Sequence, residues 1–257
     1  NCTMQTTCVA LKFGETSKDL RDVTFSNCVI TRSSRAFGIY AIWGGDVENV
    51  LVSNIVCNTN APLVLNRPFQ IAAWNKRSKE TGEVVSKGGN IRNITVSNFT
   101  ATTEGRILIT ANDDCKIENI TLRDIRLTYP YIENPSLYGP EATSSQFRGI
   151  DEQGMVANAE IVVTNTDRFV LDGLDITWPG THEVPTDWQH PERIENGKFD
   201  KVHYPLYDKH KNPACYALFL NNVQDGYIFA PMARGSVSYL DPFDINSSYI
   251  KQLSTKQ

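Results

Sequence analysis

A short segment of alternating apolar and polar residues, ending at Asn or Asp, recurs along this chain and constrains its fold more than any other feature. The clearest copies are residues 23–28, 50–55, 94–99 and 120–125, and weaker copies follow at 169–174 and 227–229. Copies start 27 residues apart at the first interval and 26 apart at the third. Alternation of this kind at such a period predicts a solenoid of stacked β-coils.

The Asn or Asp that ends each copy has a structural meaning of its own. These residues tolerate the left-handed backbone conformation that bends a chain sharply. Stacked coils bring equivalent residues together, so we expect the side-chain amides of Asn27, Asn54 and Asn98 to bond from coil to coil.

Three longer intervals interrupt the period, and we interpret them as insertions at roughly residues 67–90, 128–159 and 177–216. Insertions in solenoids emerge as loops, often on the binding face. The chain is long enough for one domain, residues 1–257, in which residues 235–257 cap the last coil.

Composition excludes several classes of function. The formal net charge is −4, without the basic stripe that nucleic-acid binding requires. No apolar run reaches the ~18 residues of a membrane span. The six cysteines lack metal-type spacing. Cys2 and Cys28 occupy the same repeat position, as a pair of buried thiols or a strained bridge.

Each coil also carries an apolar strand ahead of the repeat segment. These strands are expected at residues 8–13, 37–42, 63–66, 106–110, 161–164 and 217–221. Alternation turns one set of side chains inward and leaves outward rows for a groove. One outward row is expected to contain Lys12, Tyr40, Val64, Leu108, Val162 and Phe219, and the next Gly14, Ile42, Asn66, Thr110, Thr164 and Asn221.

Several stretches carry a resemblance to a known family. They are TTCVALKFGETS at residues 6–17, FGIYA with GG within 37–45, IENITL at 117–122, and YP with PACYAL within 204–218. These stretches resemble the polygalacturonase-type glycoside hydrolases of family 28, in their bacterial pectinase-like branch. The resemblance implies an all-β, right-handed, single-stranded parallel β-helix with long loop insertions, located outside the cell or in the periplasm.

The resemblance also implies a function without cofactors. It is the hydrolysis, with inversion, of α-linked galacturonic acid or rhamnose linkages in a pectin-like plant cell-wall polysaccharide. The family's catalytic Asp segments would precede Asn1, so the missing N-terminal part of the same protein is an expected partner besides the saccharide. A non-catalytic carbohydrate-binding β-helix and a polysaccharide lyase or epimerase stay open as alternatives.

Few residues of this chain match catalytic positions. The family's Gly-His-Gly segment falls near residues 6–8 and its Arg-Ile-Lys segment near residues 40–42, where neither His nor the basic pair is present. Asp113 and Asp151 are the catalytic candidates within the chain. Asp113 lies in an Asp-Asp-Cys run that follows its strand, a position that favours a role in a turn.

The candidates for substrate binding lie along the expected groove and in the third insertion. They are Lys12, Glu15, Tyr40, Asn66, Arg67, Arg106, Trp188 and His190. Arg suits a bidentate contact with a carboxylate, although salt bridges to Glu104 or Glu160 are an alternative. Trp188 and His190 belong to an aromatic and His-rich insertion that either walls a subsite or packs on itself. The spacing of its His residues fits no metal site.

Overall fold

The computed structural model of the chain describes residues 2–61, 66–78, 80–103, 105–112, 114–129, 159–177, 193–195, 198–200, 216–234 and 243–253. All regular secondary structure in these residues is β-strand. The strands pair in parallel, except for two short antiparallel pairs, β7 (Lys76–Arg77) with β8 (Val84–Ser86) and β13 (Arg193–Glu195) with β14 (Lys198–Asp200).

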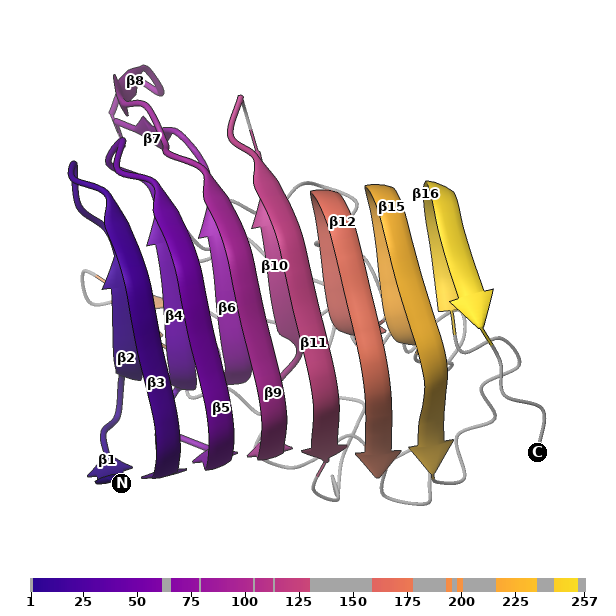
Figure 1. Ribbon diagram of the computed structural model, residues 1–257. Helices are drawn as coiled ribbons and strands as arrows, with labels where there is room; N and C mark the ends of the chain where they lie inside the picture. Colours follow the sequence, from indigo (N-terminus) through magenta and orange to yellow (C-terminus); the bar gives the residue numbers. More distant parts are fainter. Residues whose placement is uncertain are drawn as a thin grey trace.

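The parallel strands form two stacks that the chain visits alternately (Figure 1). The first stack contains β2 (Val9–Gly14), β4 (Arg35–Ala41), β6 (Arg67–Ala73) and β10 (Ile107–Ala111). The second contains β1 (Cys2–Gln5), β3 (Leu20–Thr31), β5 (Val47–Thr59), β9 (Ile91–Thr103) and β11 (Ile117–Thr128). This all-β, parallel arrangement is the one expected of a β-solenoid.

Three strands belong to both stacks. They are β12 (Ala159–Thr177), β15 (Tyr216–Arg234) and β16 (Phe243–Leu253). We call one pass through both stacks a coil: β2 with β3 is coil 1, β4 with β5 coil 2, β6 with β9 coil 3, and β10 with β11 coil 4. Strand β12 alone forms coil 5 and β15 forms coil 6, while β16 pairs in parallel with β15.

The corner residues confirm the expected left-handed turns. Backbone φ is 57° at Asn27, 55° at Asn54 and 48° at Asn98. The amides of these residues form a ladder, since Asn54 Nδ2 donates to Asn27 Oδ1 over 2.9 Å and Asn98 Nδ2 to Asn54 Oδ1 over 2.8 Å. The predicted coil-to-coil bonding is therefore confirmed, and we call this set the second ladder.

A first ladder, which the sequence analysis did not identify, lies five residues earlier in each coil. It consists of Asp22, Asn49, Asn93 and Asn119, all with positive φ. Each Nδ2 donates to the Oδ1 of the preceding coil, over 2.8, 3.0 and 2.7 Å in turn. Each of coils 1–4 therefore has two bends in the second stack. Each bend is formed by an Asn or Asp that tolerates the left-handed backbone, and side-chain hydrogen bonds within each ladder link successive coils.

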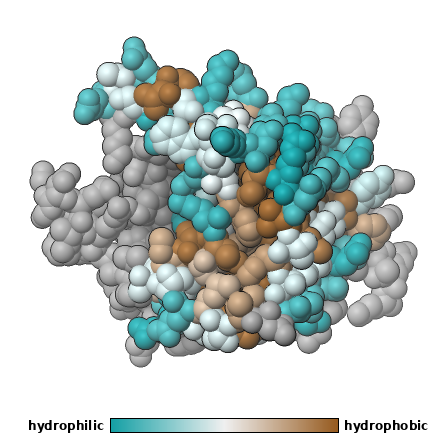
Figure 2. Space-filling model, turned by 60° about the vertical axis from the view of Figure 1, so that its left-hand side comes forward, coloured by the Kyte–Doolittle hydropathy of each residue, from teal (hydrophilic) through white to brown (hydrophobic). Residues whose placement is uncertain are grey.

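The core lies between the two stacks. It is filled by inward aliphatic side chains and by Phe37, Phe69 and Phe99, whose rings stack or meet edge to face with centroids 4.6–6.1 Å apart. Coil 1 is only partly buried: Leu11, Phe13 and other apolar residues pack on the core but keep some exposure. Figure 2, turned toward this end, shows apolar atoms at the centre with hydrophilic residues around them.

The strand of the first stack in coil 3 differs from the prediction. It is β6, whose Phe69 and Gln70 pair with Phe37 and Gly38 of β4, and not residues 63–66. Residues 62–65 lie outside the described part of the chain. The expected insertion accordingly shrinks to residues 74–90. Both stretches are apolar, and alternation alone could not choose between them. Ring stacking of Phe69 on Phe37 accompanies the observed register.

This register corrects the outward rows. The first contains Lys12, Gly38, Gln70, Leu108, Val162 and Phe219, and the second Gly14, Tyr40, Ala72, Thr110, Thr164 and Asn221. The placement of Tyr40 and Val64 beside Lys12 was wrong, as was that of Ile42 and Asn66 beside Gly14. Leu108 and Val162 are buried, so the first stack offers no open groove at these positions.

The N-terminal alignment is confirmed, because Cys2 of β1 pairs with Cys28 of β3. Both cysteines are free thiols, as the first alternative expected, although only Cys28 is buried. Burial also raises the pKa of the Cys57 thiol, which disfavours a role as nucleophile. None of the described segments forms a helix long and apolar enough to cross a bilayer.

Candidate functional site

A step in the corner between the two stacks forms a hollow on the described surface. In coils 1–4 this corner is a turn, at residues 15–19, 42–46, 74–90 and 112–116. In coil 5, Thr164 pairs with Thr110 and Thr166 with Ile117, so that Asn165 alone replaces residues 111–116. The turn of coil 4 therefore projects beyond the shorter corners of coils 5 and 6, and this difference forms the step.

The turns of coils 1–4, which we call the tall turns, are linked by a series of side-chain caps. Asp19 Oδ1 accepts a hydrogen bond from the backbone N–H of Asp46 over 3.1 Å, and Asp46 Oδ1 from that of Asn90 over 2.7 Å. Asn90 Oδ1 in turn accepts from the N–H of Lys116 over 3.0 Å. Each turn is thus held by the preceding coil, and the series ends at Lys116, where the step begins.

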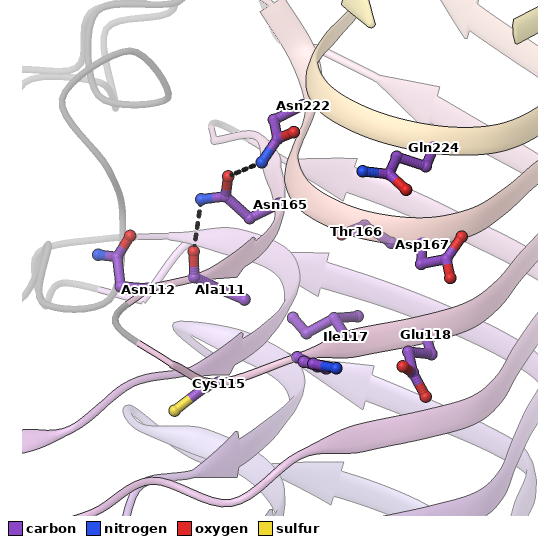
Figure 3. A pocket seen from close by; sticks show the side chains of 11 residues that line it. Ala111, Asn112, Cys115, Ile117, Glu118, Asn165, Thr166, Asp167, Asn222 and Gln224 are labelled. Atoms are coloured by element: carbon purple, nitrogen blue, oxygen red, sulfur yellow. Dashed lines mark hydrogen bonds between the residues drawn. The ribbon is translucent and has the colours of Figure 1, made fainter. Parts of the chain in front are cut away.

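The hollow beside this step, which we call the stepped hollow, has a volume of about 440 Å³. Polar side chains from three successive coils dominate its lining (Figure 3). The lining residues are Ala111, Asn112, Cys115, Lys116, Ile117, Glu118, Asn165, Thr166, Asp167, Asn222 and Gln224.

One wall of the stepped hollow is fixed by hydrogen bonds. Asn165 Nδ2 donates to the backbone oxygen of Ala111 over 2.6 Å, and Asn222 Nδ2 donates to Asn165 Oδ1 over 2.7 Å (Figure 3). Both residues have positive φ, 52° and 51°, which allows one residue to turn the corner. This wall is therefore preorganised, because its amides already have partners.

Glu118 and Asp167 lie next to each other at one side of the stepped hollow, and we call them the carboxylate pair (Figure 3). They are paired positions of β11 and β12, so their backbones are about 4.8 Å apart. They also line a second hollow of about 260 Å³, together with Arg92, Asn93, Asn119 and Arg168. Two open spaces therefore meet at this pair.

The carboxylate pair interrupts a row of alternating charge across the second stack. The row is Arg21, Glu48, Arg92, Glu118 and Asp167. Arg92 bridges Glu48 over 2.8 Å and Asp46 over 2.7 Å. Cations and anions alternate until Glu118, where a second acid follows. Two adjacent acids between cationic neighbours are suited to acid–base chemistry and to holding a polar ligand.

The structure places two of the predicted binding residues together on the first stack. Lys12 Nζ and Glu15 Oε2 form an exposed ion pair of 2.5 Å. Asn66, Arg67, Arg106 and Tyr40 are buried. Asn66 Nδ2 donates to the Ala61 oxygen over 3.0 Å, and Arg67 Nη1 donates to Gln70 Oε1 over 2.8 Å.

Substrate contact by these residues stays a prediction, and none of them lines the stepped hollow. Asp113, Asp151, Trp188 and His190 lie outside the described residues. No group of three or more His, Cys, Asp or Glu side chains able to hold a metal ion occurs within the described ranges.

Sequence reasoning missed Glu118, Asp167, Lys116 and Gln224. A signal for the carboxylate pair was present, because each of these acids directly precedes a corner residue of the repeat, Asn119 or Arg168. Extending the aligned repeats two positions upstream of residues 120 and 169 would have placed both acids in one row.

Comparison of the chain with family models, with curated proteins and with solved structures found no match.

Proposed function

We propose that this chain is a right-handed parallel β-helix that hydrolyses a pectin-like plant cell-wall polysaccharide outside the cell or in the periplasm. The observation that carries the proposal is the carboxylate pair at the stepped hollow, open to the surface and beside Lys116, Arg92 and Arg168. The resemblance to polygalacturonase-type hydrolases supports the same class of reaction and the same winding of the chain.

The carboxylate pair supplies the two groups that hydrolysis of a glycosidic bond needs. One carboxylic acid donates its proton to the glycosidic oxygen as the bond to the anomeric carbon breaks. The other, as a carboxylate, takes a proton from the water that attacks this carbon. Inversion requires the two groups ~6.5–9.5 Å apart and retention ~5 Å, so substrate-bound geometry decides the stereochemistry. The cations beside the pair suit the carboxylates of galacturonic acid.

The test is release of reducing ends from polygalacturonate and from a rhamnose-containing pectin. Glu118→Gln and Asp167→Asn should each lower kcat by about 10²–10⁴-fold with a smaller change in KM. Asp172→Asn is the matched control, since Asp172 is an exposed acid of β12 that pairs with Arg123 over 3.1 Å away from the stepped hollow.

Other outcomes would redirect the proposal. Binding of pectic oligosaccharides without release of reducing ends would contradict catalysis by the carboxylate pair. It would favour either a binding module or catalytic Asp residues upstream of this chain. Release of unsaturated uronides would instead indicate a lyase, for which Lys116 is a candidate base.

A further inference from the structure

We propose that Trp43 and Lys76 form a binding subsite for an acidic sugar residue on the tall-turn edge of coils 2 and 3. This subsite shares no residue with the stepped hollow or with the second hollow. The proposal rests on the proposed function, because it names where an acidic polysaccharide would contact the chain away from the reacting bond.

Trp43 presents an open aromatic surface. The residue is 37% exposed. Its indole N–H donates to none of the residues that the structure describes. Sugar rings present flat C–H faces to aromatic rings and hydroxyl groups to N–H donors, and Trp offers both kinds of contact.

The turn that carries Trp43 is held firmly. The preceding residue, Ile42, is buried with Tyr40 in a small cluster outside the main core, against Trp74. The Tyr40 and Trp74 rings meet edge to face with centroids 6.2 Å apart. After Trp43, the Gly45 N–H donates to the Thr16 oxygen over 3.1 Å. A residue whose neighbours in the chain are held on both sides loses little backbone freedom when it binds a ligand.

Lys76 places a positive charge on this ring. Its Nζ lies 3.5 Å from the centroid of the Trp43 ring. Lys76 pairs with Ser86 in the antiparallel ribbon of β7 and β8, which positions it above the turn. Its ammonium forms no ion pair within the described part of the chain. An exposed cation–π contact is weak, so a carboxylate can compete for the ammonium.

Three acids in the corner turns of coils 1 and 2 already have cationic partners. Glu15 pairs with Lys12, Asp19 with Arg21 and Asp46 with Arg92. None of these three acids therefore neutralises Lys76, whose ammonium stays available to an arriving carboxylate. A neutral sugar can use the Trp43 ring but gains nothing from the charge of Lys76, and this difference makes the subsite selective for uronates.

The experiment is titration of the full chain, by calorimetry at low salt, with trigalacturonate and with its fully methyl-esterified form. Wild-type protein should bind the acid form more tightly. Lys76→Met should weaken binding of the acid form about tenfold and leave the ester unchanged. Trp43→Ala should weaken both forms about tenfold, and Trp43→Phe should retain part of the affinity.

Two variants serve as controls. Arg126→Met removes an exposed cation of β11, and Tyr227→Ala removes an exposed ring of β15. Both should bind as wild type does, and thermal unfolding should show that all variants are folded.

Two results would overturn the subsite. If Trp43→Ala and Lys76→Met bind both forms as the wild type does, the subsite is wrong, while the proposed function keeps its own test at Glu118 and Asp167. If the wild-type chain binds neither form and releases no reducing ends, the proposed function fails and the subsite with it.

Discussion

Coils 1–4 and coils 5–6 turn the same corner in two different ways. Coils 1–4 use turns tied together by side-chain caps from Asp19 to Lys116. Coils 5 and 6 use one left-handed residue each, Asn165 or Asn222. The strands on both sides keep their register through the change. The length of one corner therefore decides where this surface is hollowed, without disturbing the stacked sheets.

The same two regions also differ in the side-chain interactions that link one coil to the next. Coils 1–4 carry the first ladder, which ends at Asn119. In coils 5 and 6 its positions hold Arg168 and Asp225, which form an ion pair of 3.6 Å. The hydrogen bond between side-chain amides is formed instead by Asn165 and Asn222 at the stepped hollow. The carboxylate pair lies where one set of coil-to-coil hydrogen bonds gives way to the other. Variants that remove one set should therefore show how much each contributes to stability, apart from any role of the pair in function.

The largest expected effect is on the tall turns. A Cβ at Gly45 would lie 2.2 Å from the Lys18 oxygen, and a Cβ at Gly89 would lie 2.2 Å from the Gly45 oxygen. These contacts are with backbone, so the coils must separate. We expect Gly45→Ala and Gly89→Ala each to lower the free energy of unfolding by about 3 kcal/mol, measured by urea denaturation.

Gly82→Ala is the control for these glycine substitutions. It lies between β7 and β8 at φ 73°, and nothing lies within 4 Å of its added Cβ. It should cost only about 1 kcal/mol, from the left-handed backbone alone. Equal losses for all three variants would show that close approach of the coils is unimportant.

The next effect concerns the single-residue corner of coil 5. Asn165→Ala removes the hydrogen bonds to Ala111 and Asn222 and strains a residue at φ 52°. It should cost about 2–3 kcal/mol. Asn165→Gly keeps the backbone freedom and loses only the side-chain bonds, so it should cost about half as much. A Gly variant as unstable as the Ala variant would assign the effect to the amide and not to the backbone.

Much of this fold follows from the sequence. The repeat predicted stacked parallel strands, left-handed corners at Asn27, Asn54 and Asn98, and their amide ladder, because all three depend on local chemistry repeated at one period. The register of coil 3 did not follow. Residues 63–66 and β6 both offer apolar strands, and only packing in three dimensions distinguishes them.

The candidate site was less predictable for a different physical reason. Glu118 and Asp167 are 49 residues apart, and they meet because residues 111–116 have a single counterpart in coil 5. A contact of this kind depends on the length of a corner and not on a local motif. Lys76 and Trp43 are likewise brought together only by the ribbon of β7 and β8.

A smaller, stabilising effect is expected where the second ladder stops. Asp124 follows Asn98 in this row, and a carboxylate has no N–H to donate. Asp124→Asn should extend the ladder to Asn98 Oδ1 and add about 0.5–1 kcal/mol to the free energy of unfolding. Asp22→Asn is the control: Asp22 already accepts from Asn49, and the change should be near neutral. A gain that persists in an Asn98→Ala background would contradict this explanation.

The smallest effect is a pH dependence at the first cap of the tall turns. The backbone N–H of Asp46, and then Arg21, lower the pKa of Asp19 below its usual value. A carboxyl whose pKa is lower in the folded state contributes stability above its unfolded pKa, and this contribution is lost as the pH falls through the folded pKa. Asp19→Asn can still accept the Asp46 N–H through Oδ1 but cannot titrate. We therefore expect the melting temperatures of wild type and Asp19→Asn to differ most near neutral pH and to converge as the pH falls through the lowered pKa of Asp19. A constant difference across this range would show that the charge of Asp19 does not contribute to stacking coil 2 on coil 1.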